Sequence, residues 1–479
     1  MRDLHMKLSI VDFISITEVT IHKKVNEHGY AKIKGMIESS AEEELIQKVE
    51  METYAVLSIS DENSVTKNIF AGVIEQIEIE NIGGVKTAEI HLSGATRLMD
   101  GVFHTRTYQD AGLSYEKLLD GICASYERAM YVQNCGKGAV IGDMIVQYQE
   151  NDWEFVKRLA SHFNQPIITN YGGEGIRYFF GLSTYGSGST LNEITYKIGN
   201  DKEDYFVRKE NAVRDISVQD FLFYEVKSRE YFELGDKILF QGKTLYVYEA
   251  ESQLSGSELL HTYILRPERG FLVEKKYNMK MIGASLDAEI LAVQNDTVKV
   301  CVKEDGVQEE RTAKWFPYST VYSSPDGTGW YCMPEAGDKV RLYFPNEREE
   351  EGYIISSINL GNTGETASGA GGNTGASAPR SNPDNKSISN KYNKQIELTP
   401  TSITITNNKG MSITMDDENG IDIVSDKKIN ILSEEDLSVV SLNSKVNVEA
   451  AEAIELVQGN SKITMKDDVT IEGAKLNVQ

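Results

Sequence analysis

Pairs of apolar residues separated by one polar residue recur along the last part of the chain. From residue 403 onward, such pairs of Ile, Leu, Val or Met return roughly every eight residues, about ten times. Polar turns such as 416–419 (DDEN) and 433–436 (SEED) lie between them. This alternation predicts short strands, each burying one face and exposing the other to water.

The core that these strands can build is narrow. No aromatic residue occurs after Tyr392. Two apolar residues per strand favour a β-helix or prism whose strands stack about 4.8 Å apart. We expect several chains, most naturally three, to share this core; a single-chain solenoid or small sandwich is the alternative. The positions expected to face the common axis are Ile403, Ile405, Ile413, Ile421, Ile423, Ile429, Ile431, Val446, Val448, Ile454, Leu456, Ile463, Val469 and Ile471.

The first 275 residues combine alternating strands with two amphipathic helices. Ser114 precedes one apolar-periodic run, which reaches Met130. Asn151 precedes the second, which reaches Phe163, and Glu154 stands where a capping box requires an acid. Strands are predicted at 31–37, 55–59, 73–79, 88–92, 237–240, 244–248 and 260–265.

Residues 280–360 read as a compact all-β unit. Five strands are predicted, at 288–293, 298–302, 313–316, 339–344 and 353–358. Five strands in about 80 residues fit a small barrel such as an OB-fold.

OB-folds often bind oligonucleotides, but the charge of this chain argues against that. Lys and Arg total 49 against 73 Asp and Glu, a net charge of −24. Binding phosphates requires clustered basic residues. We therefore assign Trp315, Phe316, Trp330 and Tyr331 to the barrel core and to contacts between subunits, and expect no nucleic-acid partner.

A linker separates the OB unit from the repeated strands. Residues 361–379 (GNTGETASGAGGNTGASAP) offer almost nothing that could be buried. The predicted domains are therefore 1–275, 280–360, a linker at 361–382, and 383–479.

The termini and cysteines indicate where the protein is made. No apolar run reaches the roughly 18 residues of a membrane span. Asp12, Ser15 and Thr17 interrupt the N-terminal apolar stretch, which therefore does not read as a signal peptide. The four cysteines show no CxxC spacing, which favours free thiols. We expect synthesis in the bacterial cytoplasm.

Motifs for catalysis and metal binding are weak throughout. No GxSxG elbow and no HExxH pair occur, and all seven histidines precede residue 262. The glycines at 172–175 and 186–188 read as turns, and the acidic turns at 416–419 and 433–436 lack EF-hand spacing. We expect no catalytic residue, no metal and no cofactor. The 73 acidic residues leave a carboxylate pair for sugar hydrolysis open.

Four further stretches stand out along the chain: Tyr148–Ala160 (YQENDWEFVKRLA), Tyr231–Ile238 (YFELGDKI), Met333–Phe344 (MPEAGDKVRLYF) and Glu351–Ile358 (EGYIISSI). These stretches and their order resemble the spike proteins of contractile injection systems, the VgrG family of type VI secretion and the hub–spike proteins of phage tails. The resemblance covers essentially the whole chain.

This resemblance implies a mainly β protein with some α: a hub of two related β-barrels with helical insertions, an OB barrel and a trimeric β-helical needle. It implies a homotrimer that caps a hexameric inner-tube protein at the baseplate. The needle carries a PAAR-type tip protein, docked at Leu476, Asn477, Val478 and Gln479. Contraction drives the spike through the target membrane to deliver effectors, and no signal peptide is needed. A lysozyme domain does not fit in the linker, and the ending at Gln479 predicts no fused effector.

Two other readings remain open. A trimeric tail fibre or adhesin would share the repeated strands, but it normally ends in a globular recognition domain. A tail-associated enzyme that degrades cell walls would need a catalytic domain, for which the predicted domains leave no room. The spike is therefore the preferred interpretation, and the protein is not expected to be an enzyme.

Overall fold

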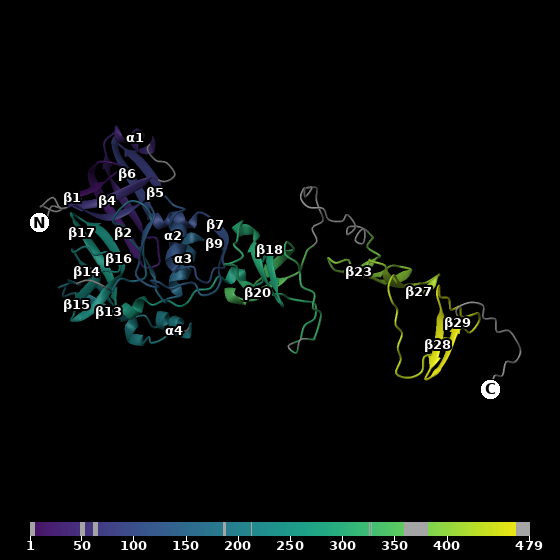
Figure 1. The fold of residues 1–479 in the computed structure, drawn as a ribbon. Helices are drawn as coiled ribbons and strands as arrows, with labels where there is room; N and C mark the ends of the chain where they lie inside the picture. The colour runs from purple at the N-terminus through teal and green to yellow at the C-terminus, as the bar shows by residue number, and fades with distance from the viewer. Residues whose placement is uncertain are drawn as a thin grey trace. The chain divides into compact units, whose positions relative to one another are not determined.

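The computed structural model describes residues 5–47, 53–60, 66–184, 188–211, 213–324, 326, 328–358 and 382–465. The chain divides into two compact units, Met1–Thr363 and Gly364–Gln479 (Figure 1). In the described part of the chain, no helix has the length and apolar character that crossing a membrane requires.

A large, mainly antiparallel sheet dominates the first unit. In the described residues it has twelve strands, in the order β1-β4-β5-β6-β3-β2-β16-β17-β14-β13, with β15 also on β16 and β12 on β15. The strands are β1 (His5–Leu8), β2 (Phe13–Lys24), β3 (Tyr30–Ile37), β4 (Tyr54–Ser60), β5 (Thr66–Ile82), β6 (Val85–Gly94), β12 (Ser189–Thr190), β13 (Tyr196–Asn200), β14 (Leu222–Ser228), β15 (Lys237–Phe240), β16 (Lys243–Ser255) and β17 (Glu258–Arg266). Every strand predicted for this region overlaps one of them.

The predicted pair of hub barrels is not confirmed. Strand β2 pairs with β3 on one side and with β16 on the other, in register from Lys24 opposite Glu249 to Thr20 opposite Gln253. This double pairing joins the two halves into one continuous sheet. Among the described residues the strands close no barrel.

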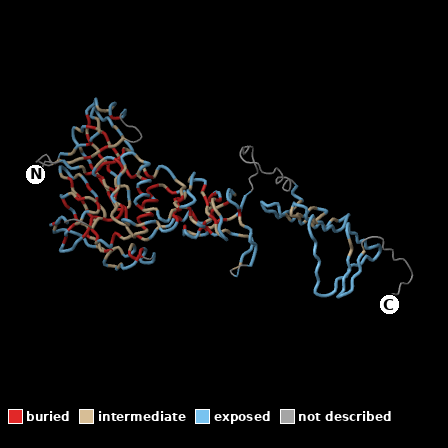
Figure 2. The backbone as a smooth tube through the Cα atoms, viewed as in Figure 1, coloured by how far each residue is buried: buried red, intermediate tan, exposed pale blue. Residues whose placement is uncertain are grey.

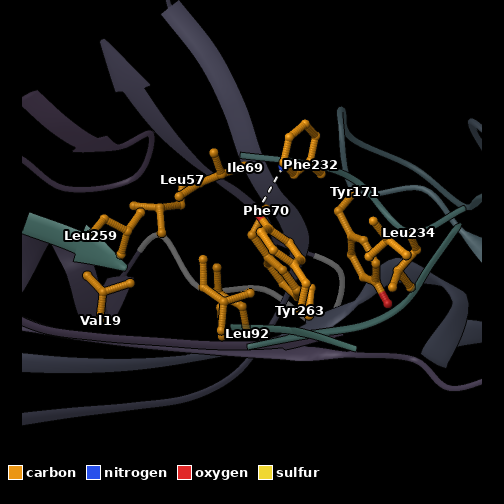
Figure 3. Packing of buried hydrophobic residues seen from close by; sticks show 14 of the residues in the cluster. Val19, Leu57, Ile69, Phe70, Leu92, Tyr171, Phe232, Leu234, Leu259 and Tyr263 are labelled. Atoms are coloured by element: carbon orange, nitrogen blue, oxygen red, sulfur yellow. Dashed lines mark hydrogen bonds between the residues drawn. The ribbon is translucent and has the colours of Figure 1, made fainter. Parts of the chain in front are cut away.

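The core of this sheet is drawn from both halves (Figure 3). The Phe70 and Tyr171 rings stack with centroids 4.9 Å apart. The Tyr263 hydroxyl accepts a hydrogen bond of 2.9 Å from the backbone N–H of Phe232. Leu92, from the first half, lies in the same cluster. Burial of these large side chains makes the two halves one folded body.

A helical insert lies between β6 and β12. It contains the helices α2 (Tyr115–Cys123) and α3 (Asp152–Ser161), the 3₁₀ turn η1 (Ala95–Asp100), and the strands β7 (Phe103–Tyr108), β8 (Met130–Gln133), β9 (Ile145–Asn151), β10 (Ile167–Thr169) and β11 (Arg177–Phe180). Two further helices are α1 (Ala41–Gln47) and α4 (Lys202–Glu210), and 3₁₀ turns form at Val218–Phe221 (η2), Glu268–Phe271 (η3) and Met279–Met281 (η4).

The first predicted helix is shorter than expected. Ser114 caps α2 by accepting a hydrogen bond from the Lys117 N–H, but the helix ends at Cys123. The predicted run reached Met130, which lies outside the helix. Met130 starts β8, where its N–H donates to the Ile176 carbonyl at 2.8 Å. Strand pairing with β11 therefore overrides the helical periodicity.

The OB unit has all five predicted strands. They are β18 (Ser285–Gln294), β19 (Thr297–Val302), β20 (Trp315–Pro317), β21 (Lys339–Tyr343) and β22 (Tyr353–Ile355). Their order is β20-β19-β18-β21-β22, and the outer strands meet through one bridge from Tyr318 to Ile354 rather than a ladder. The 3₁₀ turns η5 (Lys303–Asp305) and η6 (Glu349–Glu351) belong to the same unit.

The predicted aromatic barrel core is only partly right. Phe316 is fully buried, as expected. Trp315, Trp330 and Tyr331 are exposed, so assigning them to the core of this chain is wrong. Alternation along β20 explains the difference between Trp315 and Phe316, because neighbouring side chains point to opposite faces.

The second unit contains an antiparallel meander and a separate hairpin. The meander is β23 (Lys386–Ser389), β24 (Gln395–Leu398), β25 (Ser402–Thr406), β26 (Met411–Asp416) and β27 (Gly420–Ser425); the hairpin is β28 (Ile454–Gln458) and β29 (Ser461–Met465). The β-helix itself is not confirmed, because residues 426–453 are described without a strand although three were predicted there. The strands predicted at 469–471 and 476–478 lie outside the described residues.

Candidate assembly sites

A buried arginine connects the helical insert to the OB unit. Arg158 of α3 donates from Nε to Glu150 Oε1 at 3.0 Å and from Nη2 to Glu150 Oε2 at 2.8 Å. Its Nη2 also donates to the Val146 carbonyl at 2.7 Å, and its Nη1 donates to Glu349 Oε1 at 2.5 Å. Glu349 belongs to η6 of the OB unit. The flat guanidinium can satisfy several acceptors at once, which a lysine cannot do.

Burial makes these charges interdependent. Burial raises the pKa of Glu349, against the influence of Arg158. Burial also works against the charge of Arg158, but Glu349 and Glu150 outweigh it and raise the pKa of that guanidinium. Removing the arginine would therefore leave two carboxylates buried without their cation.

The structural role of the Tyr148–Ala160 stretch follows from the contacts around Arg158. The Asn151 side chain accepts a hydrogen bond of 2.8 Å from the Glu154 N–H and caps α3. The Glu154 carboxylate accepts from Lys157 at 2.6 Å, so it supplies no reciprocal bond of a capping box in the described contacts. Asp152 is fully buried and accepts from Gln147 Nε2 at 2.8 Å. The stretch thus encodes a helix start and a buried polar network.

Further contacts fasten the insert to the OB unit. The Thr107 N–H donates to Asp305 Oδ1 at 2.7 Å, and the Thr107 hydroxyl donates to the other carboxylate oxygen. Gln109 Nε2 donates to the Val300 carbonyl at 3.2 Å. Lys314 pairs with Asp143. We call this set, together with Arg158 and its two glutamates, the OB joint.

Strand β9 contributes to two cores at the OB joint. Val146 is fully buried in the OB core, beside Phe316, whereas Ile145 lies in the core of the helical insert. Met144, just before the strand, also lies in the OB core. Successive strand residues face opposite sides, so one strand can serve both clusters. The OB core is therefore incomplete without residues of the hub.

A polar cavity of about 280 Å³ lies at the OB joint. Arg158, His162, Lys276 and Glu349 are among its lining residues. Burial, with help from Arg158 and Lys275, lowers the pKa of His162 to about 3, so its imidazole is neutral at pH 7. His162 Nδ1 lies 2.8 Å from the Tyr115 hydroxyl. Over the described ranges, no group of three or more His, Cys, Asp or Glu is arranged to hold a metal ion.

The second unit offers a different kind of site, an exposed apolar surface. Cross-strand partners such as Ile405 and Ile413, Ile403 and Met415, or Ile413 and Ile423 share one side of the meander. We call this side the apolar sheet face; it comprises Ile388, Ile396, Leu398, Ile403, Ile405, Ile413, Met415, Ile421 and Ile423.

The apolar sheet face has no cover within its own chain. Its nine residues are 38–69% exposed, and no described residue from 382 to 465 is buried (Figure 2). A soluble chain rarely leaves so many adjacent Ile side chains in water.

The predicted needle positions fall into three described groups and a fourth that lies outside the described residues. Ile403, Ile405, Ile413, Ile421 and Ile423 lie together on the apolar sheet face. Ile454, Leu456 and Ile463 lie in the β28–β29 hairpin, and Ile429, Ile431, Val446 and Val448 are exposed outside any strand. Val469 and Ile471 lie outside the described residues, as do the tip-docking residues Leu476, Asn477, Val478 and Gln479.

The OB joint was not predicted from the sequence. The Tyr148–Ala160 stretch stood out, but its pattern assigns no role to Arg158, Glu349, Thr107 or Asp305. The apolar periodicity gave no signal for the joint, because Arg158 lies on the side of the helix opposite to Val156 and Leu159, the side predicted to be exposed. A charged residue at a buried position normally requires a partner of opposite charge.

The architecture of this chain is similar to that of known proteins. Residues 289–358 match the family model described as the type VI secretion system/phage-baseplate injector OB domain. VgrG in the lidded Francisella PdpA–VgrG complex aligns over 89% of this chain and 80% of its own, with a TM-score of 0.56 and 10% identity. The chain has the fold of a VgrG-type spike.

A second solved structure agrees with the VgrG-type fold. The E. coli c3393 protein is described as a type VI secretion component similar in structure to the T4 bacteriophage tail proteins gp27 and gp5. It aligns over 74% of this chain and 100% of its own, with a TM-score of 0.52 and 14% identity. No curated protein sequence matches the chain. The resemblance stated from the sequence is confirmed at the level of fold.

Proposed function

We propose that this protein is the structural spike of a contractile injection machine and acts as a homotrimer. The observation that carries the proposal is the apolar sheet face, because residues 382–465 bury nothing within one chain. Three such faces turned toward a common axis would form a prism with a dry interior. The spike-like fold and the match of the OB unit to injector domains support the same function.

The wider assembly follows from this proposal. The domains are a hub at 1–275 made of two halves joined in one sheet, an OB unit at 280–360, a linker at 361–382 and a needle at 383–479. The hub halves of three chains would offer six similar surfaces to a hexameric inner-tube protein. Baseplate proteins, a PAAR-type tip and effector cargo complete the set of partners. The Francisella structure is a complex of VgrG with PdpA, which supports a protein partner for this chain.

The role we propose is mechanical rather than enzymatic. The spike is assembled into a baseplate in the bacterial cytoplasm and is driven through the target membrane on contraction, without a signal peptide. Antiparallel strands that stack along the needle resist axial load, because their backbone groups are paired. The strongly acidic composition supports a protein partner and argues against nucleic acid.

The mass of the full chain in solution tests this function. Light scattering is expected to give about three times 53.5 kDa. A well-folded monomer at micromolar concentration would contradict the proposal, because the apolar sheet face would then be stable in water.

Tip docking has its own test. Deletion of residues 470–479 is expected to abolish capture of a PAAR-type tip protein while the trimer persists. Capture that survives the deletion would refute the assignment of Leu476, Asn477, Val478 and Gln479 to the docking end.

A further inference from the structure

An exposed aromatic hairpin projects from the OB unit between β20 and β21. Its described residues are 319–324, 326 and 328–333, and we call it the aromatic hairpin. Val321 is 94%, Trp330 59% and Tyr331 76% exposed, and Tyr322 is exposed as well. Exposed apolar clusters of this kind mark sites of protein contact, in which Trp and Tyr carry much of the binding energy.

The aromatic hairpin is held in shape without help from a partner. The Trp330 N–H donates to the Tyr322 carbonyl at 2.8 Å, and Ser323 bridges to Gly329. Gly329 adopts a φ of 141°, where a Cβ atom would lie 2.4 Å from the Tyr322 oxygen. Only glycine fits there. A preformed hairpin loses little conformational entropy when it binds.

The same OB unit has a cavity that is partly lined by apolar residues, as an aromatic side chain would require. A cavity of about 590 Å³ opens over β18, β19 and β21, and we call it the OB socket. Leu291, Val307 and Ile358 give it an apolar lining, and Val307 is 88% exposed. Lys303 lies at the socket and, among the described residues, has no carboxylate partner within ion-pair distance. A cavity of this size accepts large aromatic side chains.

The hairpin of one chain is anchored away from its own socket. The Tyr331 hydroxyl donates to the Asn295 carbonyl at 2.9 Å, just beyond the end of β18. The OB socket lies over residues 287–291 of the same strand. Four residues of strand cover about 13 Å, so the hairpin would have to detach to reach the socket of its own chain.

We propose that the aromatic hairpin of one copy inserts into the OB socket of the next copy. This inference rests on the proposed trimer. Hairpin and socket are different surfaces, so the contact is head-to-tail, and a rotation of one third of a turn closes it into a ring of three. Charge supports the pairing, because Asp326 at the hairpin tip would approach the unpartnered Lys303. The copies are already tied together through the apolar sheet face, which raises their local concentration.

Photo-crosslinking in the full chain tests this contact. A benzoylphenylalanine replaces Trp330, and isotopically light and heavy chains are mixed before assembly. After irradiation, mass spectrometry is expected to find light–heavy crosslinks from residue 330 to peptides 301–308 or 339–341. The same probe at Tyr196, an exposed tyrosine of the hub, is the matched control and is expected to give no crosslink to those peptides. Tyr322 offers a second probe position if the first variant assembles poorly.

A socket variant sharpens the result. Val307→Asp places a carboxylate in the apolar lining beside Asp326, and it is expected to lower the crosslink yield about tenfold. A trimeric mass with crosslinks only within one copy, or only to another surface, overturns the hairpin–socket contact and leaves the trimer standing. A monomeric mass overturns the proposed function itself.

Discussion

At the scale of single residues, Arg158 has the largest structural role at the OB joint. One side chain binds two carboxylates and a backbone carbonyl that come from two separate elements, β9 and η6. Buried ion pairs contribute little net stability compared with apolar packing, but breaking one is costly. Arg158 therefore fixes the position of the OB unit on the hub, and its replacement is expected to lower the stability of the fold.

Arg158→Met is expected to lower the free energy of unfolding by about 3–5 kcal/mol, because Glu150 and Glu349 stay buried without their cation. Urea unfolding measures the loss. Arg348→Met is the matched control: Arg348 is 57% exposed and pairs with the exposed Glu351, so its loss is expected to cost less than about 1 kcal/mol. Equal losses in the two variants would contradict the role of Arg158.

His162 makes stability depend on pH. Its pKa is lowered to about 3 by burial, so the fold binds the neutral imidazole. The stabilisation is complete above pH 6.5, the ordinary histidine value, and is lost as the pH falls from 6.5 toward 3. Urea unfolding between pH 6.5 and 4 is expected to show a loss of up to about 1.4 kcal/mol per pH unit from this residue.

His162→Asn removes the titrating group and is expected to flatten that slope by about one proton. His261, whose pKa burial lowers to about 4, and His104, whose pKa burial also lowers, still titrate in the variant and contribute to the remaining slope. A slope that does not change would mean that protonated His162 is tolerated in the fold.

At the scale of elements, alternation predicted strands well and helix length less well. The hub strands at 31–37 and 88–92 and all five OB strands were correct because each has a partner in the same chain. The helix after Ser114 was predicted too long, since periodicity cannot reveal that Met130 pairs with β11. The strands expected near Ile429 and Val446 are absent from the described structure, where no neighbouring strand pairs with them.

Strand β9 was not predicted to serve two domains. Sequence patterns assign an apolar residue to an inward face but cannot say which core that face meets. Val146 and Ile145 are adjacent and equally apolar, yet they pack into different clusters. The OB unit therefore depends on Val146, which lies well before β18, the first strand of that unit, in the sequence.

Val146→Asp is expected to destabilise the OB unit by at least about 3 kcal/mol, because it buries an unpaired carboxylate beside Phe316. Hydrogen exchange is expected to quicken in β18 and β19. Val132→Asp is the matched control, since Val132 lies on β8 of the same insert and is half exposed. Unchanged protection of β18 and β19 in the Val146 variant would show that the OB unit is independent of the hub.

At the scale of the whole molecule, the sequence predicted the apolar sheet face but not which residues would cover it. Ile403, Ile405, Ile413, Ile421 and Ile423 were predicted to share one side, and the register of the meander puts them there. In the proposed trimer they would be buried by other chains, whose contacts a single sequence does not encode position by position. The hub was likewise predicted as two barrels, whereas pairing between β2 and β16 joins its halves.

Ile413→Asp in the full chain is expected to weaken self-association by at least about tenfold, because three carboxylates would meet in the apolar interior. Thr414→Asp is the control, since Thr414 is the next residue of β26 and lies on the opposite side of the sheet. Light scattering over a dilution series measures both. Equal dissociation of the two variants would mean that the apolar sheet face is not the contact between chains.

The exposed meander also has a consequence for the life of a newly made chain. Before the proposed trimer forms, each chain would display Ile side chains and, among the described residues, the two outer edges of the meander, the features that lead to aggregation and attract proteases. Charged turns such as Asp416–Asn419 act as gatekeepers against that outcome. Doubling the amount of chain synthesised is therefore expected to more than double the yield of intact spike. A cell that makes too little of the chain is expected to lose most of it to degradation.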